Sequence, residues 1–506
     1  MIAAEEVEAL AAAYEAGRAG VRVVTLVADL ETPVSAYLKL AAARSGNMFL
    51  LESIEGGAQR GRYSMIGLDP DLVWRASGAR SEINRRALLE PEAFAPCPGA
   101  PLDALRALLA ESRFDLPAGL PPMAAGVFGY LGYDMVRHME RLAPAKPDPI
   151  GAPEAVMIRP TIMVVFDGVR DEISVVTPVR PQSGVSARAA LEAAQNRLDA
   201  IVATLEGPLA HVPPPVDPTL MAGEPESNTS AAEFDEMVVR AKEYIAAGDI
   251  FQVVLSQRFT SRFDLPAFSL YRALRRVNPS PYLCFLDFGG FQIVVSSPEI
   301  LVRVSAGKVT IRPIAGTRWR GRTPEEDQSL AAELLADPKE RAEHLMLLDL
   351  GRNDVGRVAR IGTVKVTDSF FVERYSHVMH IVSNVEGELL PGRDTLAALA
   401  AGFPAGTVSG APKVRAMEII DELEKDKRGI YAGCIGYFGA GGDMDTCIVL
   451  RASIVKDGRM HVQAGAGIVY DSEPEYEGRE CVNKARALFR AAEEAVRFAT
   501  RARRGQ

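Results

Sequence analysis

Hydrophobic and polar residues alternate along this chain in two patterns, and together they predict both helices and strands. Short apolar runs that end at polar or glycine-rich turns are typical of buried strands. They occupy residues 21–30, 48–51 and 251–259. Apolar residues that recur every three to four positions predict amphipathic helices. These occupy residues 33–44, 102–111 and 186–205.

The order of the elements favours an α+β fold. Residues 159–167 and 173–178 are β-prone runs joined by an Asp167-Gly168 turn, which predicts an antiparallel hairpin. Beyond residue 230, strands and helices alternate without a regular βαβ period and without a GxGxxG turn. We therefore expect large antiparallel or mixed β-sheets flanked by helices, and not a dinucleotide-binding fold.

One proline-rich segment divides the chain. Residues 211–229 are rich in proline and polar residues and predict a linker between residues 1–210 and residues 230–500. The second part begins with a helix, because Ser230 and Glu233 form a capping-box pattern and Gly248 is a typical helix end.

Two further predicted helices carry paired carboxylates. Asp337 and Pro338 predict a helix start, and Glu340 can close a capping box. Glu340 and Glu343 are three residues apart, so they share a helix face that continues into apolar residues such as Leu347.

The second acidic pair lies near the C-terminus. Ser472 and Glu475 form another capping-box pattern, and Glu477 and Glu480 follow three residues apart. Four carboxylates that face one another repel unless a cation lies between them, and Mg²⁺ binds one or two carboxylates directly while keeping water and substrate oxygens. The sequence therefore indicates a magnesium site between two helices.

Simpler interpretations of the same glutamates remain open. Glu340 can act only as a cap and Glu343 as a solvated surface residue. Glu480 can form a weak ion pair with Lys484, four residues along the same helix.

Composition and charge exclude several classes of protein. The formal net charge of −9 argues against a nucleic-acid or anionic-membrane partner. The acidic, amphipathic N-terminus resembles neither a secretory signal nor a transit peptide, and no apolar run is long enough to span a membrane. The five cysteines are far apart and form no CxxC pair, so we expect reduced thiols in a cytoplasmic protein.

Dense polar islands within apolar surroundings fill the second half of the sequence. They are SSPEIL at Ser296, PIAGTR at Pro313, EHLMLLDLGRND at Glu343, HVMHIVSNVEG at His377, PAGTVSGAPK at Pro404, GYFG at Gly436, CIVLRAS at Cys447 and VQAGAGIVYDSEPEYEGRE at Val462. In their order and spacing these motifs resemble the chorismate-utilising enzymes, and within them the component I chains of anthranilate synthases. The resemblance covers nearly the whole chain. It implies a β-sandwich whose N-terminal regulatory half is interwoven with a C-terminal chorismate-binding half.

The resemblance implies a Mg²⁺ cofactor and a binding site for a dianionic substrate. Glu343 and Glu480 match the metal ligands of the family, with Glu340 and Glu477 acting through water. Chorismate needs cations and backbone N–H groups around its two carboxylates. The residues that match these substrate contacts are Gly316, Thr317, Tyr437, Arg451, Gly465, Ala466 and Gly467.

The implied reaction adds ammonia at ring C2 as the C4 hydroxyl leaves, and then eliminates pyruvate to give anthranilate. His380 matches a histidine beside that hydroxyl, and imidazole is suited to general acid catalysis near neutral pH. Thr407 matches a neighbouring active-site threonine. Glu299 matches a carboxylate that helps to remove the proton in the elimination step. Outside the resemblance, a histidine on an apolar stretch such as His380 is more often a hydrogen-bonded core residue.

Two residues distinguish this chain from related enzymes. Aminodeoxychorismate synthases carry a lysine nucleophile where this chain has Ala315, and enzymes that add water carry a lysine base where it has Gln252. An amide cannot act as that base. The alternatives are an aminodeoxychorismate synthase or a non-catalytic sensor of tryptophan or chorismate.

The resemblance also implies regulation and a partner. The segments LLES and NPSPY match a pocket for the inhibitor L-tryptophan, with Ser53, Pro279, Ser280 and Pro281 as its residues; without the resemblance, NPSPY is a rigid turn. No cysteine lies in a GxCxG-type elbow, so we expect ammonia to come from a glutamine amidotransferase subunit, component II, or from free ammonium.

Overall fold

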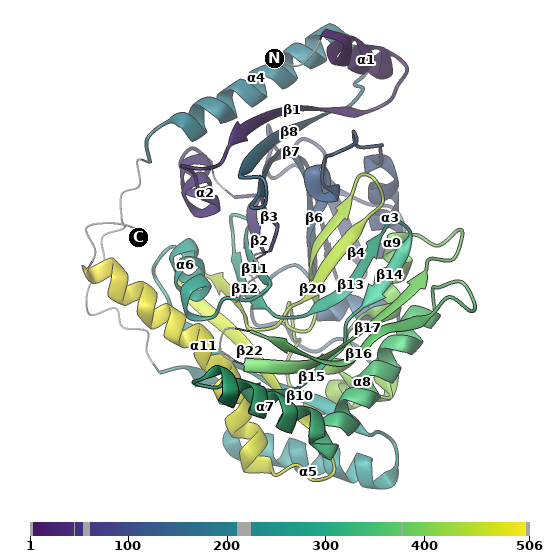
Figure 1. Ribbon diagram of the computed structural model, residues 1–506, viewed down its shortest axis with the longest axis vertical. Coiled ribbons are helices and arrows are strands. Elements are labelled where there is room, and N and C mark those ends of the chain that lie inside the picture. The colour runs from purple at the N-terminus through teal and green to yellow at the C-terminus, as the bar shows by residue number, and fades with distance from the viewer. Residues whose placement is uncertain (1–3, 45, 54–60, 210–223, 376–377, 502–506) are drawn as a thin grey trace.

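The computed structural model describes residues 4–44, 46–53, 61–209, 224–375 and 378–501 (Figure 1). Most of the predicted linker 211–229 lies outside these residues, and so does His377 at the start of one polar island. Every strand pair that the structure defines is antiparallel, which confirms the predicted α+β class with large antiparallel sheets.

Within the described residues, the N-terminal half supplies four α-helices, two short 3-10 helices (η1 and η2) and the first strands. Its elements are α1 (Ala4–Glu15), β1 (Gly20–Val27), α2 (Pro33–Ala41), β2 (Met48–Glu52), β3 (Tyr63–Ser77), β4 (Arg80–Asn84), β5 (Ala95–Pro96), α3 (Pro101–Ser112), η1 (Pro122–Ala124), β6 (Gly126–Leu131), η2 (Tyr133–His138), β7 (Ala155–Asp167), β8 (Glu172–Val179) and α4 (Ala187–Glu206).

The C-terminal half supplies the remaining strands and the two acidic helices. Its strands are β9 (Glu226–Ser227), β10 (Gln252–Arg262), β11 (Tyr282–Asp287), β12 (Gln292–Ser297), β13 (Ile300–Ser305), β14 (Lys308–Ile311), β15 (Ile314–Trp319), β16 (Lys365–Arg374), β17 (Val378–Glu388), β18 (Gly410–Ala411), β19 (Cys434–Gly439), β20 (Met444–Ile448), β21 (Ala452–Lys456) and β22 (Arg459–Ile468). Its helices are α5 (Ala231–Ala247), α6 (Ala267–Val277), α7 (Pro324–Ala336), α8 (Pro338–Gly356), α9 (Thr395–Gly402), η3 (Gly406–Val408), α10 (Lys413–Leu423) and α11 (Pro474–Arg501).

Local sequence signals set several element ends correctly. Ser230 and Glu233 form the predicted capping box of α5, and Gly248 ends that helix in the left-handed conformation. The predicted β7–β8 hairpin also forms, with Phe166 opposite Ile173. In α8, Asp337 caps the backbone N–H groups of Lys339 and Glu340.

The predicted capping box at α8 is replaced by an ion pair. Glu340 Oε1 lies 3.1 Å from Nη1 of Arg318 on β15, so its carboxylate faces the sheet. A guanidinium on the adjacent strand offers a charged donor, whereas the cap offers one backbone N–H. Glu340 is thereby directed toward the same strand as Gly316 and Thr317.

Strand pairing interweaves the two halves, as the resemblance implied. β2 of the first half pairs with β11 of the second, with Leu51 opposite Cys284, and β6 pairs with β19, with Gly129 opposite Gly436. A buried apolar cluster continues across the join and includes Phe49, Phe128, Ile293 and Ile435. The halves therefore share one core.

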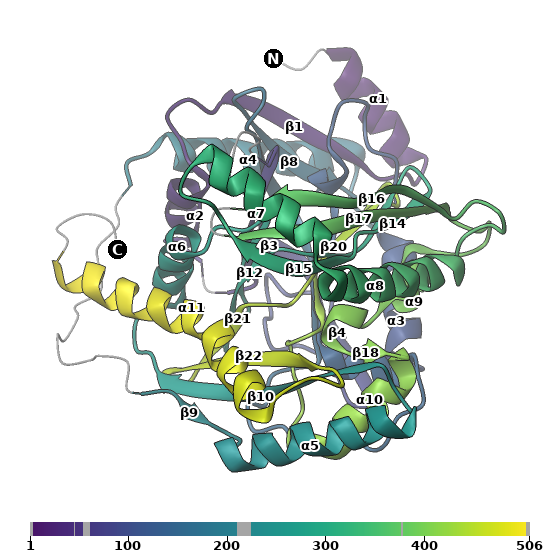
Figure 2. The same cartoon turned by 60° about the horizontal axis from the view of Figure 1, so that its bottom comes forward.

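Helices cover the sheets at both ends of the molecule (Figure 1). α1 and α4 lie at one end, beside β1 and β8, and α5, α7 and α11 lie at the other. Figure 2 shows α7, α8 and α11 in front of the sheets. Within the described residues, α8 packs on β15 and β17, and α11 packs on β22.

Two global expectations from the sequence can be compared with the structure. None of the described helices combines the length and the apolar character that crossing a lipid bilayer requires. All five cysteines carry free thiols, and four of them are buried.

Candidate active site

The carboxylates of α8 and α11 lie close enough to interact electrostatically. The pKa of Glu343 is raised from its ordinary value by burial, and further by the negative charges of Glu340 on its own helix and Glu480 on α11. The side-chain amide of Gln252, the first residue of β10, donates a hydrogen bond to the Glu343 carboxylate. Three elements that are distant in sequence therefore meet at Glu343.

Lys484 is a residue of this site that the sequence pattern did not single out. Its Nζ lies 2.5 Å from Oε1 of Glu480 and donates to the backbone oxygen of Gly465 at 3.0 Å. The ion pair that we considered as the simpler interpretation of Glu480 thus forms, but it forms inside the acidic site. Its i,i+4 spacing was visible in the sequence, whereas its bond to β22 was not.

The donor set fits a hard divalent cation. One buried oxygen of Glu477, Oε2, has no hydrogen-bond partner, and burial together with Glu480 raises the pKa of this carboxyl. Among the described residues no three His, Cys, Asp or Glu side chains form a ready-made metal cluster. A cation held here therefore takes at most two carboxylates directly and needs water or substrate oxygens, as Mg²⁺ prefers.

A bulge in the sheet holds His380. The register between β15 and β17 shifts between Ala315 and Arg318, so that Gly316 and Thr317 lie opposite the single residue His380. Nδ1–H of His380 donates to the backbone oxygen of Gly316 at 2.7 Å, and Oγ1 of Thr317 lies 3.2 Å from the same nitrogen.

These contacts leave Nε2 of His380 as its open nitrogen. Burial lowers the pKa of His380, the Gly316 carbonyl raises it, and the positive charge of Arg451 lowers it again. A histidine in this state releases a proton readily.

Glu299 and Thr407 form a second proton site. Burial raises the pKa of Glu299 to about 8, while a hydrogen bond from Thr407 and the backbone N–H of Ile314 lower it in part. Oγ1 of Thr407 lies 3.3 Å from Oε1 of Glu299. Near neutral pH this carboxyl exchanges a proton easily.

Arg451 is a buried cation without a carboxylate partner among the described residues. Burial lowers the pKa of its guanidinium, with a small opposing effect of Tyr375. Among the described residues no carboxylate forms an ion pair with Arg451. Its backbone is left-handed, with φ of +47°, which is uncommon for a residue other than glycine. A buried guanidinium without a carboxylate suits an anionic ligand.

The glycine strand β22 offers free backbone near Lys484. Gly465, Ala466 and Gly467 pair with β10 on one side, whereas the pairing of β22 with β21 ends at Val462. Within the described residues, the other edge at 465–467 therefore faces no strand. A Cβ on Gly467 would lie 2.5 Å from Nε2 of Gln252, so a larger residue there would displace that amide.

The tyrosine beside this strand is Tyr431 and not the predicted Tyr437. A backbone hydrogen bond from Gly465 reaches the Tyr431 side chain, and burial raises the pKa of that phenol. Tyr437 lies on β19 and lines a separate cavity together with Ser53 and Pro281. Tyr431 lies just before β19 and Tyr437 lies within it, so the sequence alone did not distinguish them.

The two residues that separate related chemistries also lie in the site. Gln252 is buried between Glu343 and Gly467, and its Oε1 has no hydrogen-bond partner. Ala315 is buried on β15 opposite Ile381, directly before the bulge that holds His380. Neither position carries an amine.

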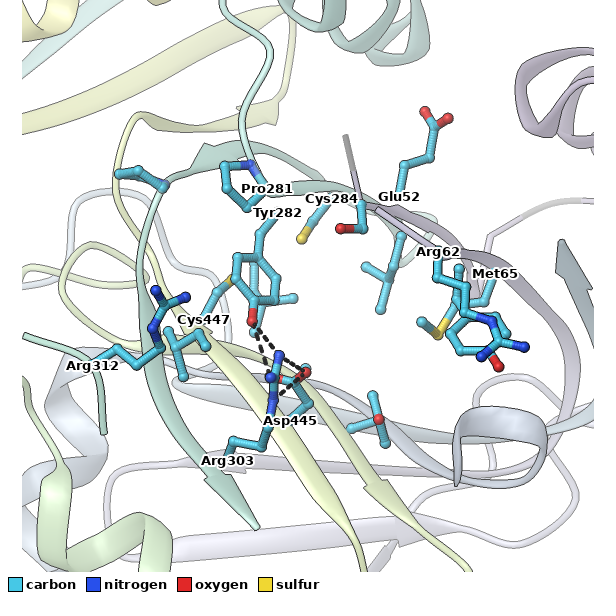
Figure 3. Close-up of a pocket in the computed structure, with 18 of the residues that line it drawn as sticks. Glu52, Arg62, Met65, Pro281, Tyr282, Cys284, Arg303, Arg312, Asp445 and Cys447 are labelled. Atoms are coloured by element: carbon cyan, nitrogen blue, oxygen red, sulfur yellow. Dashed lines mark hydrogen bonds and ion pairs between the residues drawn. The ribbon is translucent and has the colours of Figure 1, made fainter. Parts of the chain in front are cut away.

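A cavity of about 720 Å³ opens between the two halves of the molecule (Figure 3). Its wall includes Ser53, Arg62, Pro281, Tyr375 and Tyr437. The volume suits a small organic ligand. Of the four residues predicted for the tryptophan pocket, Ser53 and Pro281 line this cavity. Pro279 and Ser280 do not: the hydroxyl of Ser280 accepts a hydrogen bond from Ser296.

Charged groups at the cavity wall are paired with one another. Figure 3 shows Arg303 between Tyr282 and Asp445, and Nη2 of Arg303 lies 2.7 Å from Oδ2 of Asp445. Across the cavity, Glu52 accepts from Nε of Arg275 at 2.9 Å and from the Tyr271 hydroxyl. The cavity thus offers both signs of charge around an apolar interior.

Known proteins are similar to this chain in sequence and in fold. The family described as chorismate binding enzyme matches residues 56–490. Anthranilate synthase component 1 of Cereibacter sphaeroides is 58% identical over 493 residues, which cover 97% of this chain and 98% of that protein. The crystal structure of anthranilate synthase component I from Streptococcus pneumoniae matches with a TM-score of 0.73 and 36% identity, over 92% of this chain and 99% of that one.

A more distant structure shares the fold. The menaquinone-specific isochorismate synthase of Escherichia coli matches with a TM-score of 0.70 at 20% identity, over 96% of this chain and 98% of that one. At this identity the likeness concerns the fold alone. The choice between chemistries therefore depends on site residues such as Gln252 and Ala315.

Proposed function

We propose that this chain, which belongs to the chorismate binding enzyme family, converts chorismate and ammonia into anthranilate and pyruvate. The observation that carries the proposal is the meeting of Glu343, Glu480 and Gln252. It combines a carboxylate pair suited to a dication with an amide where water addition needs a base. The component I relatives support the same assignment over nearly the whole chain.

Chorismate would bind between β15, β17 and β22. Arg451 supplies a buried positive charge for the enolpyruvyl carboxylate, and the edge of β22 at residues 465–467 that pairs with no described strand supplies backbone groups, with Gly465 shared with Tyr431. The backbone at Gly316 and Thr317 would contact the other end of the substrate. We assign Tyr431 to the substrate end beside Gly465, whereas the predicted Tyr437 belongs to the cavity wall.

The acidic helices would hold a Mg²⁺ ion. Glu343 and Glu480 would bind it directly, and Glu340 and Glu477 would act through water. When bound, this ion supplies positive charge against the ring carboxylate of the substrate. Lys484, which pairs with Glu480, would then be free to shift toward the substrate carboxylate.

His380 would act as the general acid of the first step. Its Nδ1–H stays bound to the Gly316 carbonyl, and a proton on Nε2 passes to the C4 hydroxyl as the C4–O bond breaks. Ammonia forms the new bond at C2, and the hydroxyl leaves as water. The lowered pKa of His380 makes its imidazolium a stronger acid and reduces the fraction of the histidine that carries the second proton near neutral pH.

Glu299 would accept the proton in the second step. The ionised fraction of this carboxyl takes the proton from C2 of the intermediate, and the C–O bond between the ring and the enolpyruvyl group breaks. The enolpyruvate that leaves takes up a proton at its methylene carbon and becomes pyruvate. The product is then aromatic. Thr407 holds Glu299 in place through its hydroxyl.

A separate subunit would supply the ammonia. The relatives are named component 1, and no cysteine of this chain lies in a nucleophile elbow. We propose a glutamine amidotransferase partner, component II, with free ammonium as a substitute in its absence.

The cavity at Ser53 and Pro281 would bind L-tryptophan as a feedback inhibitor. Residues 1–210 would form the regulatory half, 211–229 the linker and 230–500 the catalytic half, although residues of both halves line the cavity. Inhibition must then be transmitted from the cavity to His380.

The decisive experiment supplies the purified chain with chorismate, Mg²⁺ and ammonium. We expect blue-fluorescent anthranilate and an equal amount of pyruvate. Isochorismate, aminodeoxychorismate or no product would overturn the proposal. Saturable tryptophan binding without turnover would instead indicate a sensor.

The metal assignment predicts that Glu343→Gln and Glu480→Gln each abolish turnover. Each change removes one of two charged ligands from the ion, so Mg²⁺ affinity should fall at least about tenfold. Isothermal titration calorimetry of Mg²⁺ with each variant measures this loss directly. Glu333→Gln, an exposed glutamate paired with Arg318, is the control. Mg²⁺ affinity equal to that of the wild type in both variants would place the ion elsewhere.

The regulatory assignment predicts that Ser53→Phe blunts tryptophan inhibition. The larger side chain fills part of the cavity, while the ammonium-dependent rate should remain largely intact. Inhibition curves with tryptophan measure the effect. Pro279→Ala should change inhibition little, because Pro279 does not line the cavity. Unchanged sensitivity of Ser53→Phe would remove Ser53 from the pocket.

A further inference from the structure

Tyr375 separates the cavity from the candidate active site. Its side chain lines the cavity that also contains Ser53 and Pro281. Its ring packs edge-on against the ring of His380, with the centroids 5.4 Å apart and the planes at 65°. One side chain therefore touches both the space assigned to the inhibitor and the histidine assigned to catalysis.

The backbone and hydroxyl of Tyr375 are tied to charged groups of the cavity wall. Its hydroxyl donates to Oε2 of Glu373 at 2.8 Å, and Oε1 of Glu373 accepts from Nη2 of Arg312 at 2.9 Å. Nη1 of Arg320 donates to the backbone oxygen of Tyr375 at 2.6 Å. Glu373, Arg312 and Arg320 all line the cavity. A charged ligand there competes for these bonds.

Tyr375 is the contact that connects the ring of His380 with the cavity. Gly316 and Thr317 both hold Nδ1, so they fix one atom of the imidazole. The edge contact with Tyr375 limits the tilt of the ring about that atom, and hence the direction of Nε2. Tyr375 is also close enough to Arg451 and Glu299 for electrostatic interaction with each.

We propose that Tyr375 is the positioning residue through which a ligand in the cavity changes the orientation of His380. A ligand that draws Glu373 or Arg312 toward itself moves the Tyr375 hydroxyl, and the ring of Tyr375 then tilts His380 away from the C4 hydroxyl. The inference rests on the proposed function. It adds the physical route of regulation, which needs different ligand contacts in the two arrangements.

Thermodynamic coupling between the two sites tests this route. The dissociation constant of tryptophan is measured by calorimetry with Mg²⁺ present, with and without saturating anthranilate. The ratio of these two dissociation constants measures the coupling between the two sites. A substitution that changes tryptophan affinity equally with and without anthranilate leaves this ratio unchanged. We expect a ratio of about five or more for the wild type and of about one for Tyr375→Leu.

A matched control comes from the same region of the sheet. Phe370 on β16 packs edge-on against His344, with the centroids 4.8 Å apart, and does not line the cavity. Phe370→Leu removes the same kind of contact and should keep the wild-type ratio. If Tyr375→Leu does not fold, Tyr375→Phe serves instead: it keeps the ring, loses the bond to Glu373, and should lower the ratio.

The magnetic resonance signal of His380 gives a readout independent of affinity. It is assigned by its loss in His380→Gln, and we expect tryptophan to shift it in the wild type but not in Tyr375→Leu. If Tyr375→Leu keeps the coupling ratio of the wild type, or if Phe370→Leu lowers that ratio as much as Tyr375→Leu does, the inference is overturned. If the wild-type protein itself shows a coupling ratio of one, the regulatory assignment is overturned as well. Failure of the proposed reaction would show separately, as absence of anthranilate from the ammonium assay.

Discussion

At the scale of single residues, burial decides which groups can exchange protons at neutral pH. Glu299 and His380 occupy low-dielectric surroundings that disfavour their charged forms, so the pKa of the acid rises and that of the base falls. The raised pKa of Glu299, about 8, therefore lies above the lowered pKa of His380, the reverse of their ordinary order. At neutral pH each proposed role uses the less populated protonation state: the ionised carboxylate of Glu299 and the imidazolium of His380.

The raised pKa of Glu299 predicts a pH-dependent stability difference between the wild type and Glu299→Gln. The folded-state pKa of about 8 exceeds 4.5, the ordinary value of a glutamate that the unfolded chain retains. The wild type is therefore most stable, relative to the variant, below the unfolded pKa. This extra free energy of unfolding is lost progressively as the pH rises from 4.5 to 8, at about 1.4 kcal/mol per pH unit.

Thermal melts of both proteins between pH 5 and pH 9 measure this difference. We expect the stability of Glu299→Gln relative to the wild type to increase up to about pH 8, because the neutral amide carries no charge to bury. The difference should then become constant. In the ammonium assay its rate should fall by about 10²–10⁴, the usual contribution of a general base. A stability difference that does not change with pH would show that Glu299 titrates normally.

Some residue roles could be predicted from the sequence and others could not. The pairs Glu340–Glu343 and Glu477–Glu480 follow from helical spacing alone, and in the structure Glu343 interacts electrostatically with Glu480. Lys484 has an ordinary i,i+4 pattern, and only the approach of β22 places it in the site. Spacing predicts neighbours within an element, but it does not predict neighbours across elements.

At the scale of elements, the bulge of β15 is the feature that the hydrophobic pattern could not predict. Helix ends such as Asp337 and Gly248 follow from local chemistry, and they agree with the structure. A bulge depends on the partner strand: Gly316 and Thr317 together oppose His380 only because β17 lies beside them. Motif resemblance, and not periodicity, pointed to these residues.

The bulge predicts that Gly316→Ala impairs catalysis more than its backbone strain alone would. Gly316 has φ of +68°, and an added Cβ would lie 2.9 Å from Oε2 of Glu340. The substitution should cost about 1–3 kcal/mol of stability, displace Glu340 and disturb the carbonyl that holds His380. We expect the ammonium-dependent rate to fall at least about tenfold, since a small displacement of a catalytic group has effects of this order.

Gly307→Ala is the matched control. Gly307 has φ of +75° in the turn between β13 and β14, and its Cβ would meet no atom within 4 Å. It should lose similar stability and keep its activity. Thermal melts and the anthranilate assay on both variants separate strain from displacement. Equal activity of the two variants would show that the Gly316 backbone does not support the site.

At the scale of the whole molecule, one sheet network joins the halves that the proline-rich segment separates. The composition of residues 211–229 indicated a linker, and such segments usually separate independent domains. Composition reports only on the segment itself. The antiparallel pairs β2–β11 and β6–β19 cross between the halves, and the interweaving was implied by the family resemblance and not by the pattern.

The shared sheet predicts that residues 224–506 do not fold alone. Without the first half, β11 loses β2 and β19 loses β6, which exposes two strand edges and the apolar surface under Phe49 and Phe128. Open edges of buried strands favour aggregation. The stabilisation lost with the apolar surface buried between the halves exceeds what a marginally stable chain can lose. We expect the fragment to show no cooperative thermal transition and no anthranilate formation. Co-expression with residues 1–209 should restore both, because the strand pairs themselves, and not the connecting segment, hold the halves together. A fragment 224–506 that melts cooperatively and remains active would mean that the C-terminal half carries a complete core and a complete site, and that the N-terminal half only regulates it.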